Sequence, residues 1–124
     1  MNITETRRAP EPPAHIAPYV AALGVDDAVR FFLALGGADI YVPRRSSPRS
    51  IAARTIGAGN VEKLAEVIGS GYIKVPLARQ WVAQVMQARG DSLAEIARTV
   101  RADVATVRRW LGPSAAAHQM DLFS

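Results

Sequence analysis

The stretch Ser92 to Leu111, SLAEIARTVRADVATVRRWL, decides how the last third of the chain folds. Ser92 and Glu95 have the S-x-x-E spacing of a capping box, which opens a helix by satisfying free backbone N–H groups. Apolar residues then recur on one helical face, at Leu93, Ile96, Ala97 and Val100. This pattern predicts a first short amphipathic helix.

A second helix is predicted after a break of a few residues. Asp103 is suited to cap its N-terminus, and its apolar positions are Val104, Val107 and Leu111. Two such helices predict a helix-turn-helix, whose second helix enters the DNA major groove. The break has Arg101 where such units usually have glycine, because one residue there takes a positive φ. The alternative is an ordinary helical hairpin with solvated arginines.

The outward face of the second helix is the candidate DNA-contacting surface. Arg108 and Arg109 are expected to bind guanine, and Ala105 and Thr106 to meet a phosphate or a thymine methyl group. Phosphate contacts are typical of the first helix and the turn. The candidate interface is Arg98, Arg101, Asp103, Ala105, Thr106, Arg108 and Arg109.

Composition agrees with a nucleic-acid partner. The 124 residues have a net charge of +4 and a pI of about 10.1, a balance that favours phosphate backbones. There is no cysteine, and no apolar run approaches the length of a membrane span. No catalytic, metal-binding or nucleotide-binding motif is recognisable. We therefore expect a cytoplasmic protein that is not an enzyme and has no metal or cofactor.

The middle of the chain contains an internal repeat. Residues 23–43 (LGVDDAVRFFLALGGADIYVP) align without a gap with residues 56–76 (IGAGNVEKLAEVIGSGYIKVP), 33 positions later. In each copy Asp27 or Asn60 is expected to cap an amphipathic helix, and Gly36 or Gly69 to end it in the left-handed conformation. The apolar positions are Ala28, Phe31, Phe32 and Leu35 in one copy, and Val61, Leu64, Ala65 and Ile68 in the other. A very short strand then ends at a proline.

A strand this short must pair with another. The two strands would pair with each other inside one chain, or with those of a second subunit. A twofold dimer makes the second kind of pairing isologous, and on this ground we expect a homodimer. The alternative is a monomer whose two strands close one small ribbon.

These elements predict a mostly α protein with short β-strands. A disordered tail is expected over residues 1–17, followed by a dimerisation region over 18–76. A three-helix DNA-binding domain is expected over 77–111, beginning with a helix whose apolar stripe is Ala78, Trp81, Val82, Val85 and Met86. Trp81 and Trp110 are interpreted as core residues of that domain. Residues 112–124 are expected to form a flexible tail.

The chain resembles the Mor (middle operon regulator) transcription activators of Mu-like phages. The resemblance lies in Leu23-Gly24-Val25-Asp26, in the phrase from Leu35 to Arg44, LGGADIYVPR, and in the order of the later elements over residues 18–111. It implies a dimeric bacterial DNA-binding activator, nucleoid-associated, with its recognition helix at residues 103–111. The chain departs from the family in the second repeat and at Arg101. Activation would also require a contact with RNA polymerase.

Two further segments have functional interpretations. Arg44, Arg45, Arg49 and Arg54 form a basic cluster between the repeats, interpreted as a flanking phosphate contact or as a solvated linker. The C-terminal peptide Gln119-Met120-Asp121-Leu122-Phe123 resembles the motif with which bacterial proteins dock on the replication sliding clamp. In the alternative, Leu122 and Phe123 fold back onto the body.

The sequence thus favours a homodimeric, sequence-specific regulator that binds double-stranded DNA. The competing hypothesis is a dimeric interaction adaptor whose tail recruits the clamp or another protein.

Overall fold

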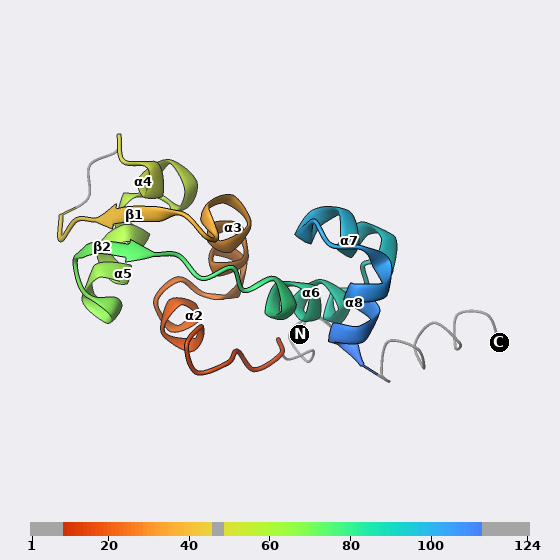
Figure 1. The fold of residues 1–124 in the computed structure, drawn as a ribbon. Helices are drawn as coiled ribbons and strands as arrows, with labels where there is room; N and C mark the ends of the chain where they lie inside the picture. The colour runs from red at the N-terminus through yellow and green to blue at the C-terminus, as the bar shows by residue number, and fades with distance from the viewer. Residues whose placement is uncertain (1–8, 46–48, 113–124) are drawn as a thin grey trace. The chain divides into compact units, whose positions relative to one another are not determined.

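The computed structural model describes residues 9–45 and 49–112. Within them the chain has seven helices and one two-stranded antiparallel sheet (Figure 1), which confirms the predicted fold class. The chain divides into two compact units, one spanning residues 11–78 and the other containing residues 79–112 with residues 9 and 10. The boundary lies within two residues of the one predicted. No helix in the described part of the chain is long and apolar enough to cross a membrane.

The first unit, hereafter the repeat unit, is built from two successive α-α-β segments. The first segment is α2 (Ala17–Leu23), α3 (Val25–Leu35) and β1 (Asp39–Val42). The second is α4 (Ile51–Ile56), α5 (Ala58–Ile68) and β2 (Gly71–Lys74). The repeat therefore extends further toward the N-terminus than residues 23–43 and 56–76, because α2 and α4 are also equivalent.

The two segments interlock around a local pseudo-twofold axis. β1 and β2 pair antiparallel, and the central pair joins Ile40 to Ile73, which are equivalent residues 33 positions apart. Across the axis, α2 packs on α5 and α4 packs on α3 (Figure 1). The two strands thus pair within one chain. The homodimer was expected because the strands could pair between subunits, and this ground for it no longer holds.

The helix starts differ from those predicted. Asp27 and Asn60 do not cap their helices, because α3 and α5 begin earlier, after Gly24 and Gly57. Both glycines have nearly the same backbone, with φ of 80° and 88° and ψ of 165° and 151°. A residue with a Cβ rarely adopts this conformation. One glycine therefore ends a helix and starts the next in each copy.

Gly36 also differs from its prediction. Its φ is −54°, and the positive φ of 84° belongs to Gly37. A Cβ at position 36 would lie 2.5 Å from the Phe32 carbonyl oxygen and 3.2 Å from that of Pro76. Gly36 is therefore required by close backbone approach. Gly69 has a positive φ of 93°, although its ψ of 155° is outside the left-handed helical region.

The core of the repeat unit is more aromatic in its first half. Tyr19, Phe31 and Phe32 form a cluster with ring centroids 5.5–6.0 Å apart. The equivalent positions in the second half are Ala52, Leu64 and Ala65, all of them buried. In the ribbon, Ile40 and Val42 face the core, while Tyr41 and Tyr72 pack edge to face on the exposed side.

The second unit, hereafter the C-terminal unit, contains α6 (Arg79–Ala88), α7 (Leu93–Val100) and α8 (Val104–Leu111), each packed against the other two. Trp81 is only 2% exposed and its Nε1 donates to the Pro10 carbonyl at 3.0 Å. Its predicted core position is confirmed, whereas Trp110 is half-buried. Ala78 of the predicted stripe lies before the helix and Met86 is half-buried.

The structure also corrects the last part of the expected N-terminal tail. Ile16 is 1% exposed, its N–H donates to the Pro13 carbonyl at 2.9 Å, and α2 begins at Ala17. Residues 9–17 are therefore an ordered part of the fold, and the tail prediction remains only for residues 1–8, which lie outside the described part of the chain.

Candidate nucleic-acid interface

The helix-turn-helix begins with a capped α7. The Ser92 hydroxyl accepts from the Glu95 N–H at 3.1 Å, as the capping-box spacing predicts. The residues predicted for its buried face, Leu93, Ile96, Ala97 and Val100, are all buried. This cap and face fix where α7 begins and which side it turns toward α6 and α8.

The turn after α7 depends on Arg101. Its φ of 60° and ψ of 49° are left-handed, the conformation that the sequence assigned to this position. The Arg79 Nη1 donates to the Arg101 carbonyl oxygen at 3.2 Å, which ties the turn to the start of α6. Sequence reasoning missed Arg79, because a contact across 22 residues leaves no periodic signal.

α8 begins with a second cap. The Asp103 Oδ1 accepts from the Thr106 N–H, and this bond, together with one from the Thr106 side chain, lowers the pKa of Asp103 below its usual range. Arg109 contributes a smaller effect in the same direction. Asp103 therefore fixes where α8 begins, and its place in the candidate interface is a structural one.

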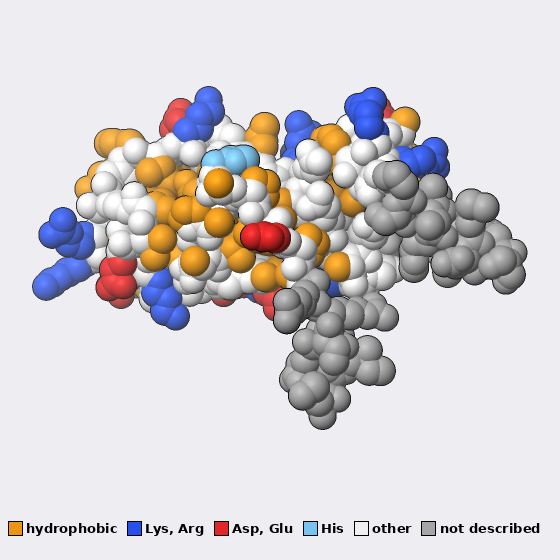
Figure 2. All heavy atoms as spheres, turned by 90° about the horizontal axis from the view of Figure 1, so that it is seen from below, with side chains coloured by type: hydrophobic (Ala, Val, Ile, Leu, Met, Phe, Trp, Pro, Cys, Tyr) orange, Lys and Arg blue, Asp and Glu red, His pale blue; other side chains and the backbone are white. Residues whose placement is uncertain are grey.

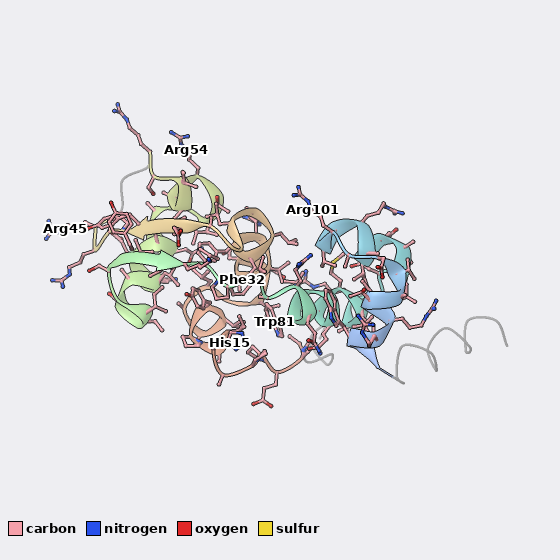
Figure 3. All side chains as sticks on the ribbon, in the orientation of Figure 1. His15, Phe32, Arg45, Arg54, Trp81 and Arg101 are labelled. Carbon is pink, nitrogen blue, oxygen red and sulfur yellow. The ribbon has the colours of Figure 1, made fainter. Side chains whose placement is uncertain are left out.

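The arginines that the sequence predicts to contact DNA are all exposed. Val107 is completely buried and fixes the inner face of α8, while Arg108 and Arg109 on the other side are exposed. Ala105 is also exposed, and Thr106 is half-buried. On the first helix and turn, Arg98 and Arg101 are exposed, and Arg101 extends into solvent (Figure 3). The helix-turn-helix thus presents a basic surface on α8 and on the turn between α7 and α8.

Val104 was predicted to lie on the buried apolar face of α8, and the structure corrects this prediction. It is 37% exposed, because it stands at the first position of the helix, before the turn that packs against α6 and α7. The exposed N-terminal part of α8 is therefore Val104 and Ala105. Small apolar groups at the start of a helix can make apolar contacts such as one with a thymine methyl group.

The second basic cluster lies in the repeat unit. Arg44, Arg45, Arg49 and Arg54 are all exposed, and Arg45 and Arg54 project away from the ribbon and α4 (Figure 3). Arg54 belongs to α4, whereas the other three lie in the connection between β1 and α4. The predicted loop therefore ends one residue after Arg49, where Ser50 caps α4 by accepting from the Ala53 N–H at 3.0 Å.

The remaining candidate features are His15, possible metal ligands and the tail peptide. His15 is exposed, and Figure 2 shows it among hydrophobic side chains. Within residues 9–45 and 49–112, no group of three or more His, Cys, Asp or Glu side chains is placed to hold a metal ion. The tail peptide, Gln119 to Phe123, lies outside the described residues, so clamp docking stays a prediction from sequence.

The fold and the surface together define a small helical protein with a helix-turn-helix unit joined to a duplicated α-α-β unit. No protein-family model, curated protein or solved structure matches the chain. The resemblance to the Mor family therefore stays a prediction.

Proposed function

We propose that the chain is a sequence-specific DNA-binding transcription regulator that places α8 in the major groove. The observation that carries the proposal is the division of α8 into two faces. Val107 and Leu111 are buried against the unit, and Arg108 and Arg109 are exposed on the other side. Exposed arginines on the second helix of such a unit suit bidentate contacts with guanine.

The capping and turn geometry supports the same proposal. Side-chain caps at Ser92 and Asp103 define the starts of α7 and α8, and the hydrogen bond from Arg79 anchors the turn between them at Arg101. A fixed orientation matters because bidentate recognition requires side chains to reach base edges in a defined register.

The test compares two double variants that remove the same charge. DNA sites are first selected from a random pool, and binding is then measured by fluorescence anisotropy on the selected and a scrambled duplex. We expect Arg108→Ala with Arg109→Ala to lose selectivity by about 30-fold or more, since each bidentate pair contributes about 1–3 kcal/mol of discrimination.

The matched control is Arg44→Ala with Arg45→Ala, which removes two exposed charges from the repeat unit. It should weaken binding to both duplexes and leave their ratio unchanged, because phosphate contacts are independent of sequence. Circular dichroism checks that each variant is folded. Equal selectivity of the Arg108/Arg109 variant and the intact protein would contradict the proposal.

A further inference from the structure

The centre of the β-ribbon has the geometry of an isologous interface. In a twofold dimer, the residue on the axis faces its own copy in the partner. Here Ile40 faces Ile73, its equivalent in the repeat. The pairs on either side, Asp39 with Lys74 and Tyr41 with Tyr72, are images of each other under the 33-residue offset.

A second contact lies on the same axis. The Asn60 Nδ2 donates to the Asp27 Oδ2 at 2.8 Å, and these two residues are also equivalent. Hydrogen bonds outside the ladder extend the pairing, with the Val75 N–H donating to the Ala38 carbonyl at 2.9 Å. The surfaces that a twofold dimer of α-α-β segments would use are therefore occupied within one chain.

We infer that the repeat unit is an intramolecular equivalent of a dimer, so that the protein binds DNA as a monomer and reads one asymmetric site. This inference rests on the proposed function for its DNA part. One helix-turn-helix accompanies the two repeats in the described part of the chain. A monomer with a single helix-turn-helix has no second recognition helix to bind the other half of a palindrome.

The residues on the axis also disfavour a dimer in which the first α-α-β segment of one chain pairs with the first segment of another chain. Such a pairing would place Asp27 against a second Asp27, and like charges at hydrogen-bond distance repel. Asp27 already has Arg30 at 3.4 Å on its other oxygen and Asn60 across the axis. The hydrogen-bonded pair of Asp27 and Asn60 is thus already formed within one chain.

The experiment measures mass and DNA stoichiometry on the full chain. Sedimentation equilibrium over a wide concentration range should give a single mass of 13.3 kDa. Titration onto the selected duplex should saturate at one protein per site, and the enriched sequence should lack twofold symmetry. A mass of twice this value, or two proteins on a palindrome, would overturn the inference.

The two proposals fail in distinguishable ways. If the pool gives no enriched sequence, the proposed function fails, while the sedimentation result still decides between monomer and dimer. If a palindrome is enriched and bound by two chains, sequence-specific binding stands and the monomeric inference fails. A dimer formed by exchanging repeats between chains would appear as the doubled mass.

Discussion

Exchanging Asp27 and Asn60 tests whether the contact between them holds the two repeats together. Asn60 donates to Asp27 at 2.8 Å and also to the Ile56 carbonyl at 2.9 Å. A hydrogen bond to a charged group contributes about 1.5–3 kcal/mol, and we expect the lower part of this range because the Asp27 side chain is 30% exposed. Asn60→Asp loses this bond and adds repulsion between two carboxylates.

The expected free-energy loss for Asn60→Asp is about 2–3 kcal/mol, equivalent to a fall in Tm of roughly 10–20 °C for a unit of this size. The double variant Asp27→Asn with Asn60→Asp should recover most of that loss. Lys63 is the equivalent of Arg30 in the second repeat and follows position 60 by three residues, as Arg30 follows Asp27. The carboxylate moved to position 60 therefore also has a cation nearby.

The chain offers separate optical probes for the assay. All three tyrosines lie in the repeat unit, and both tryptophans lie in the C-terminal unit. Thermal unfolding followed by second-derivative tyrosine absorbance therefore reports on the variants where they act, and tryptophan emission reports on the other unit. Equal stability of Asn60→Asp and the intact protein, or a double variant no more stable than Asn60→Asp, would refute the reasoning.

Three further predictions concern the C-terminal unit, all measurable by tryptophan emission during unfolding. Val107→Ala should destabilise it by about 2 kcal/mol, because it removes two buried methyl groups and leaves a cavity; no measurable change would show that α8 does not pack as described. Arg101→Gly should stabilise the unit by about 0.5–1 kcal/mol by relieving the left-handed strain at φ 60°; destabilisation would mean that the side chain supports the turn. The lowered pKa of Asp103 means that its contribution is present above about pH 4 and is lost as the pH falls through the pKa of the folded state. Asp103→Asn should therefore flatten the acid side of the stability profile, and an unchanged slope would contradict this assignment.

The sequence predicted local features well where the cause is local. The caps at Ser92 and Asp103, the left-handed Arg101 and the buried face of α7 all follow from residues within one or two turns of each other. Exposure of Arg108 and Arg109 followed from helical spacing alone. Val104 was predicted as buried because periodicity does not show where a helix lies relative to its neighbours.

The features that sequence reasoning missed depend on contacts between distant segments. A Cβ at position 36 would meet the Phe32 carbonyl oxygen at 2.5 Å, and also the Pro76 carbonyl oxygen at 3.2 Å and the Leu77 Cα at 3.3 Å. No pattern near position 36 indicates the approach of Pro76 and Leu77. The Asp27–Asn60 bond joins residues that were interpreted separately as helix caps. The 33-residue repeat was visible, but choosing between pairing inside one chain and pairing between chains required the register of the ribbon.

Placing both halves of a twofold arrangement on one polypeptide changes how it can evolve. In a symmetric homodimer, each substitution occurs on both sides of the axis, so neither side can specialise alone. Here the halves have already diverged, with Tyr19 in an aromatic cluster where the other half has Ala52, and a carboxylate at Asp27 where the other half has an amide. Each half of this scaffold is free to acquire a surface of its own while the shared ribbon at Ile40 and Ile73 is kept.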